Sequence, residues 1–189
     1  MEAIWNNGIT FIVWFQGLGG WLQTPMKFFS LLGSAEFYLV LLPLLYWCVD
    51  ASLGLRIGAI TMFSSGANEI LKLSFHGPRP YWLSAQVKAY LAEKSFGIPS
   101  GHAQNGASLW GMAAALVRRP WAWLLAGFLI LMIGVSRLYL GVHFPLDVLL
   151  GWAFGILTAW AFSSWWETAA SWAARKSLGQ QFVLALALS

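Results

Sequence analysis

Long apolar stretches alternate with short polar joints along this chain. A helix needs about 20 mostly apolar residues to cross the hydrocarbon core of a bilayer. Five stretches approach or exceed this length, at residues 28–49, 55–75, 100–117, 121–141 and 144–166. The pattern predicts an all-α fold, a polytopic membrane helical bundle of about six transmembrane helices, in a single domain over residues 1–189.

The apolar segments at the two ends of the chain are less regular. The segment from Ala3 to Leu22 contains Asn6, Asn7, Gln16 and several glycines, so it is either the sixth span or a helix in the membrane interface. The residues from 181 onward begin another apolar run that stops at Ser189. We expect either a short interfacial turn there or, preferably, the truncated start of a further helix.

The composition supports a membrane protein. The chain is 59% hydrophobic and 10% charged, whereas soluble domains carry about 25% charged residues. Thirteen Trp and thirteen Phe suit the two bilayer interfaces. The net charge of +4 is dispersed, which argues against a nucleic-acid partner. Cys48 is the only cysteine, which excludes an intramolecular disulfide and a thiolate metal site.

Residues that could perform chemistry gather in three clusters at the ends of apolar stretches. In the last cluster, His143 and Asp147 are four residues apart at the start of a predicted helix, so they share a face. The carboxylate can accept the Nδ1–H of the imidazole and leave Nε2 free as a nucleophile. Arg137 can return to the same spot across a short turn. The alternative is an arginine that reaches the interface beside a helix-capping His and Asp.

The second cluster, Pro99-Ser100-Gly101-His102, precedes the apolar stretch at 100–117. Ser100 is expected to cap that helix, and the free N–H groups that follow form a seat for an anion. Gly101 would allow close approach to the backbone, and His102 could protonate a leaving oxygen. A simple helix cap is the alternative.

The first cluster consists of Lys72 and Arg79, at the end of the stretch at 55–75 and just beyond it. Both side chains are suited to bind phosphate. The alternative is that they are two cations whose side chains extend to the membrane interface, which would give the same sequence pattern. Glu69, one turn before Lys72, is the expected ion-pair partner. Asn68 is a second candidate to orient the lysine. A long connection from 76 to 98 follows, opened by two prolines that cannot continue a helix.

Taken together, the clusters read Lys-x6-Arg-Pro, Pro-Ser-Gly-His and Ser-Arg-x5-His-x3-Asp. In this the chain resembles the type 2 phosphatidic acid phosphatase (PAP2) superfamily, over about residues 55–166. The runs Arg79-Pro80-Tyr81-Trp82 and Ser136-Arg137-Leu138-Tyr139 are also similar to the glucose-6-phosphatase branch.

The resemblance implies a phosphoric monoester hydrolase with His143 as the nucleophile that forms a phosphohistidine. Asp147 would hold His143, and His102 would act as general acid and then general base. The phosphate would be held by five residues: Lys72, Arg79, Ser100, Gly101 and Arg137. The scheme requires no metal and no cofactor, and vanadate should occupy the site.

A site where helices meet the membrane surface suits a lipid phosphate as partner, because the tail can remain in the bilayer. Candidates are phosphatidate, phosphatidylglycerol phosphate, a polyprenyl pyrophosphate and a sphingoid phosphate. The loop cations, apart from those in the clusters, number five on the opposite side and three on the same side. This bias predicts a site on the extracytoplasmic face of the cytoplasmic membrane, but it reverses if the cluster cations are counted.

Three other functions are compatible with parts of the pattern. A phosphotransferase on the same scaffold would differ only in its acceptor. A glucose-6-phosphatase-like sugar phosphatase would need an open polar mouth. A transporter would carry charges at mid-helix depth on several spans, whereas here they gather at helix ends. The sequence carries no indication of the oligomeric state.

Overall fold

The computed structural model describes residues 2–177, 179 and 180, and within them it contains helices and no strand. The expected further helix from residue 181 lies outside the described residues. The helices are α1 (Glu2–Gln16), η1 (Gly20–Leu22), α2 (Gln23–Leu31), α3 (Ala35–Leu44), η2 (Leu45–Val49), α4 (Ala51–Phe75), α5 (Pro80–Leu83), α6 (Gly101–Val117), α7 (Pro120–Tyr139) and α8 (Pro145–Ala174).

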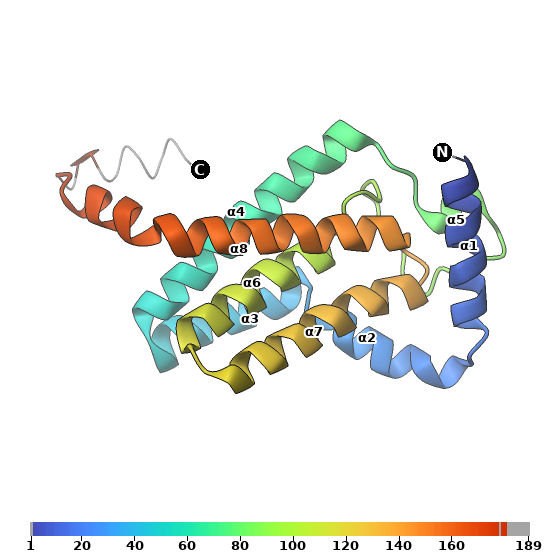
Figure 1. The fold of residues 1–189 in the computed structure, drawn as a ribbon, viewed down its shortest axis with the longest axis horizontal. Coiled ribbons are helices and arrows are strands. Elements are labelled where there is room, and N and C mark those ends of the chain that lie inside the picture. Colours follow the sequence, from blue (N-terminus) through green and yellow to red (C-terminus); the bar gives the residue numbers. More distant parts are fainter. Residues whose placement is uncertain (1, 178, 181–189) are drawn as a thin grey trace.

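Helix α6 lies at the centre of the bundle, in contact with α4, α7 and α8 (Figure 1). Small residues permit its close packing on α8. A Cβ added at Gly151 would come 2.6 Å from the backbone oxygen of Ser100, and one at Gly155 would meet the backbone oxygen of Gln104. Helices in membranes associate through such close approaches, because burial from lipid provides little hydrophobic driving force. The second cluster is therefore packed directly against α8.

Among the described residues, two helices, α7 and α8, are long and apolar enough to cross a membrane, and one bent helix pair also passes that test. The pair joins residues 20–31 to residues 35–49 with a bend of 49°. The prediction of one uninterrupted helix over 28–49 is therefore wrong, while a broken span over this segment stays compatible with the structure. Ser34 ends the continuity, because its side chain accepts a hydrogen bond from the backbone N–H of Phe37 at 3.4 Å and starts α3. Gly33 lies tightly against Ile133 at the bend.

The stretches predicted at 55–75 and 100–117 form α4 and α6. Helix α4 is long enough to cross a hydrocarbon core, at about 37 Å for 25 residues, but it carries Arg56, Glu69 and Lys72. Helix α6 has 17 residues. The number of about six spans stays a prediction.

Helix α1 lies across one end of the bundle rather than along it (Figure 1). Its 15 residues extend about 22 Å, less than the core of a bilayer at roughly 30 Å. Trp14 and Trp21, in and just after α1, are 61% and 74% exposed. These features favour the interfacial alternative over a sixth span.

Gln16, at the end of α1, connects that helix to two other parts of the chain. Its side-chain nitrogen donates to the backbone oxygens of Lys88 at 2.8 Å and Tyr139 at 2.9 Å. Its side-chain oxygen accepts from the backbone N–H of Lys88 at 3.0 Å. The contacts hold the loop of residues 84–100, hereafter the α5–α6 loop, against the end of α7.

Candidate active site

The three sequence clusters meet at one end of the bundle, where α4 ends, α6 begins and the chain turns from α7 into α8 (Figure 1). Six of the eight predicted site residues are buried: Lys72, Arg79, Ser100, Arg137, His143 and Asp147. Gly101 and His102 are partly exposed. Residues separated by up to 75 positions thus share one site.

Asp147 contacts His143 as the spacing predicts. Its Oδ2 lies 3.3 Å from Nδ1 of His143 and also accepts the backbone N–H of Phe144 at 2.9 Å. The second bond fixes the carboxylate at the first turn of α8, which begins at Pro145, where a missing N–H has no cost. The carboxylate is therefore held in place independently of the imidazole.

The other ring nitrogen of His143 faces a cation. Its Nε2 lies 3.4 Å from Nη1 of Arg79. A guanidinium has only donors, so Nε2 must accept, and the proton of the neutral ring resides on Nδ1, toward Asp147. Burial lowers the pKa of His143 well below its ordinary value, and the charges of Arg79, Arg137 and Lys72 lower it further. The ring is thus a neutral base with its lone pair directed at the cations.

Arg79 is fully buried, and all three nitrogens of its guanidinium donate hydrogen bonds. Its Nε donates to the backbone oxygen of Ser95 at 2.7 Å, and Nη1 donates to that of Val142 at 2.9 Å. Its Nη2 donates to the backbone oxygen of Phe96 at 3.1 Å and to Oγ of Ser95 at 3.2 Å. The α5–α6 loop thus supplies most of its acceptors.

Lys72 shares Ser95 with Arg79. Its Nζ donates to Oγ of Ser95 at 2.8 Å, and the predicted ion pair with Glu69 is present at 3.7 Å. Asn68, expected beside Lys72, donates instead to the side-chain oxygen of Gln104 at 2.9 Å and to the backbone oxygen of Pro99 at 3.3 Å. The amide therefore supports the turn that leads into α6.

Ser100 caps α6 as predicted. Its Oγ accepts from the backbone N–H of Ala103 at 3.5 Å, and its own N–H donates to the backbone oxygen of Asp147 at 2.9 Å. The latter bond joins the second cluster to the third. A Cβ at Gly101 would come 2.9 Å from Oδ1 of Asn68. The glycine is therefore needed for packing, independently of any ligand.

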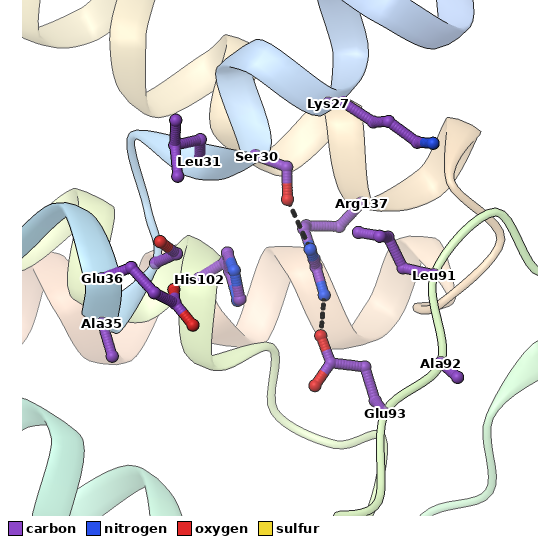
Figure 2. Close-up of a pocket in the computed structure, with 11 residues that line it drawn as sticks. Lys27, Ser30, Leu31, Ala35, Glu36, Leu91, Ala92, Glu93, His102 and Arg137 are labelled. Carbon is purple, nitrogen blue, oxygen red and sulfur yellow. Dashed lines mark hydrogen bonds and ion pairs between the residues drawn. The ribbon is translucent and has the colours of Figure 1, made fainter.

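His102 and Arg137 lie on a cavity of about 550 Å³ between the α2–α3 bend and the α5–α6 loop (Figure 2). The other lining residues are Lys27, Ser30, Leu31, Ser34, Ala35, Glu36, Leu91, Ala92 and Glu93. Figure 2 shows the guanidinium of Arg137 between Ser30 and Glu93. Nη1 donates to Oγ of Ser30 at 2.5 Å, and Nη2 pairs with Oε1 of Glu93.

Ser30, Glu93 and Ser95 belong to the site, although the sequence did not identify them. All three contact predicted cations: Ser30 and Glu93 contact Arg137, and Ser95 contacts Lys72 and Arg79. None of them belongs to one of the sequence motifs. Their contacts depend on a helix bend and on the path of a loop, which no local pattern encodes. Within the described residues, no group of three or more His, Cys, Asp or Glu is arranged to hold a metal.

Comparison with known families supports the sequence resemblance. A family model described as the PAP2 superfamily matches residues 53–171. Phosphatidylglycerophosphatase B of Bacillus subtilis (strain 168) is 28% identical over 150 residues, which cover 72% of this chain and 71% of that protein. Glucose-6-phosphatase 3 of Rattus norvegicus is 30% identical over 145 residues, which cover 64% of this chain but only 42% of the rat protein. The chain thus spans less than half of that relative.

A solved structure also resembles the fold closely. The crystal structure of a transmembrane PAP2-type phosphatidylglycerolphosphate phosphatase from Bacillus subtilis superposes with a TM-score of 0.75 at 26% identity. The superposition covers 89% of this chain and 88% of the other. The likeness extends beyond the motif-bearing helices to nearly the whole chain.

Proposed function

Because the chain belongs to the PAP2 superfamily, we propose that it is a membrane-embedded phosphatase that acts on a lipid phosphate or pyrophosphate monoester through a phosphohistidine. The observation that carries the proposal is the arrangement around His143: Asp147 on Nδ1 and the guanidinium of Arg79 next to Nε2. A phosphate bound by Arg79 would lie beside the nucleophilic lone pair.

In the first step, Nε2 of His143 bonds to phosphorus while the bond from phosphorus to the lipid oxygen breaks. His102 donates a proton to that oxygen, a transfer that typically contributes about 10²–10⁴-fold in rate. Asp147 stabilises the positive charge that the imidazole acquires, since its carboxylate already contacts Nδ1. The alcohol then leaves toward the bilayer.

In the second step, water gives a proton to His102 while its oxygen bonds to phosphorus. The bond from phosphorus to Nε2 breaks, which releases inorganic phosphate and restores His143. Both steps develop charge on the non-bridging oxygens, and preorganised donors typically contribute about 3–4 kcal/mol each to lowering such a barrier. Lys72, Arg79, Arg137, Ser100 and the amide of Gly101 are the proposed donors.

A lipid substrate is supported by the position of the site in a membrane protein. The site lies where α7 ends and α8 begins, and both helices qualify as spans. A head group could reach His102 and Arg137 through the cavity while the tail stays in hydrocarbon. The relative and the solved structure from Bacillus subtilis are both named for a lipid phosphate. The proposed location is the extracytoplasmic face of the cytoplasmic membrane.

A sugar phosphatase is the second candidate. Lys27 and Glu36 give the cavity mouth a polar rim, as an entry for a soluble phosphate requires, and one relative is a glucose-6-phosphatase. Transfer of the phosphoryl group to an acceptor other than water would use the same first step.

The proposal is tested by phosphate release from detergent-purified protein in the presence of EDTA. The substrates are phosphatidate, phosphatidylglycerol phosphate, a polyprenyl pyrophosphate and glucose 6-phosphate. Release that survives EDTA and disappears in His143→Ala supports the metal-independent histidine mechanism, and the order of rates identifies the substrate class. Lack of release from every substrate contradicts the proposal.

A further inference from the structure

One short segment of the α5–α6 loop provides oxygen acceptors to all three proposed phosphate-binding cations. Ser95 supplies its Oγ to Lys72 and Arg79, and its backbone oxygen to Arg79. Glu93, two residues earlier, supplies its carboxylate to Arg137. Hydroxyl, carbonyl and carboxylate oxygens thus occupy the donors that a phosphate would need. Of these acceptors, only Glu93 carries a charge.

The pairing between Glu93 and Arg137 has a clear electrostatic cause. The side chain of Arg137 is 1% exposed, and a buried unpaired cation carries a large desolvation cost. The other terminal nitrogen of the guanidinium, Nη1, donates to the neutral hydroxyl of Ser30. A carboxylate at this position neutralises the guanidinium in the same way as one anionic oxygen of a phosphate would.

The Glu93 side chain is free to leave without movement of the loop. Its side chain is 30% exposed, unlike that of Arg137. Its backbone is held from both sides by Tyr81, whose hydroxyl donates to the oxygen of Glu93 at 2.9 Å and accepts from its N–H at 3.2 Å. The cavity of about 550 Å³ in front of the ion pair offers space for another rotamer (Figure 2).

We propose that Glu93 competes with the substrate phosphate for Arg137 and so sets the affinity that an anion must exceed to occupy the site. This inference rests on the proposed function of the site. Every anion that binds Arg137 must first displace the carboxylate. The apparent affinity of that anion is therefore its intrinsic affinity multiplied by the fraction of protein in which Arg137 is unpaired. A monoester dianion binds the cluster of cations strongly enough to do so. The singly charged phosphodiesters of ordinary membrane lipids bind it too weakly and are kept out.

The test is calorimetric binding of two probes to detergent-purified protein at pH 8. The probes are inorganic phosphate, a dianion at this pH, and dimethyl phosphate, a monoanionic diester. In Glu93→Gln, which keeps the shape and removes the charge, both dissociation constants should fall by the same factor of about ten, as expected for loss of one charged hydrogen-bonded pair. In Glu93→Ala both dissociation constants should also fall.

Glu36→Gln is the matched control, because Glu36 lines the same cavity but makes no contact with Arg137 in the described chain. Glu36→Gln should change the two dissociation constants several-fold less than Glu93→Gln does. In an Arg137→Ala background, Glu93→Gln should bring no gain. Weaker or unchanged phosphate binding in Glu93→Gln overturns the inference, since Glu93 would then support Arg137 rather than compete for it. An equal gain in Glu36→Gln also overturns it.

The two proposals fail in different ways. The failure of the phosphatase proposal is a wild-type protein that releases no phosphate from any substrate. The failure of the competition proposal is seen in binding alone, and it leaves the hydrolysis of the wild type untouched.

Discussion

Nη1 of Arg79 lies 3.4 Å from Nε2 of His143, although 64 positions separate the two residues. The contact fixes the tautomer of the imidazole, because the guanidinium can only donate. It also places a proposed phosphate ligand directly beside the lone pair of the proposed nucleophile, on a guanidinium that backbone oxygens hold in place.

Asp147→Asn should lower kcat by at least about 100-fold, because an amide can present its NH₂ to Nδ1 and favour the wrong tautomer of His143. The measurement is the initial rate on the best substrate, with size-exclusion chromatography as a check on folding. A correctly folded variant with wild-type kcat would contradict the proposed role of Asp147.

The activity should persist to lower pH than an ordinary histidine nucleophile permits. The nucleophile must be neutral, and an unperturbed His is half protonated at about pH 6.5. Burial first, and then the nearby cations, lower the pKa of His143, so the acidic limb of kcat/KM is expected well below pH 6.5. In Arg79→Gln one of these cations is removed, and the limb should move to higher pH while the rate falls.

The same shift has a consequence for stability. The folded protein binds the His143 proton less readily than the unfolded chain does, so this group favours folding above about pH 6.5 and the benefit is lost as the pH falls below it. The free energy of unfolding of wild type should therefore decrease more steeply toward acid than that of His143→Gln. Parallel pH dependences of the two proteins would contradict a lowered pKa.

Gly101→Ala should lower the thermal stability of the protein. Its Cβ would come 2.9 Å from Oδ1 of Asn68, and crowding of this kind costs about 1–3 kcal/mol. Gly111→Ala, on the same helix, is the control, since its Cβ would make an ordinary contact of 3.5 Å with Ala159. The melting temperatures of both variants in detergent provide the comparison, and equal values would show that the space at Gly101 is not limiting.

Gln16→Ala should loosen the α5–α6 loop, because the backbone groups of Lys88 and Tyr139 lose their side-chain partner. An unsatisfied buried group costs about 1–3 kcal/mol, so the melting temperature should fall. KM should change as well, because the loop carries Ser95, which contacts Lys72 and Arg79. Thr10→Ala, on the exposed face of the same helix, removes only a local hydrogen bond to Asn6. A Gln16 variant that matches Thr10→Ala in KM and melting temperature would exclude a role for the Gln16 hydrogen bonds in holding the loop.

The helices of the catalytic core could be predicted well from the sequence. The stretches expected at 121–141 and 144–166 are α7 and α8, at 120–139 and 145–174. Their apolar runs are long, and each helix begins at a proline, which suits a first helical turn. The bend in the segment at 28–49 is hard to predict, because Gly33 and Ser34 lie in an otherwise apolar stretch, and Gly33 packs against Ile133 only once the chain is folded.

The site was predictable only where the motif spacing is local. His143 and Asp147 are one helical turn apart, and Ser100 caps its own helix, so neighbouring residues determine both arrangements. The partners of Arg137 come from α2 and from the α5–α6 loop, 107 and 44 positions away. Such contacts follow from packing of the whole chain, which the motif does not encode.

The central claim is a covalent bond between phosphorus and His143, and trapping it tests the account most directly. Substrate labelled with ³²P in the phosphate is mixed briefly with the wild type, His102→Ala and His143→Ala, and the protein is quenched in alkali, in which phosphohistidine survives. The account predicts label on the wild type and none on His143→Ala. On His102→Ala the label should form more slowly, because the leaving oxygen is not protonated, and should then also be lost more slowly, because water is not activated. Label that persists on His143→Ala, or an active wild type that never acquires label, would contradict it.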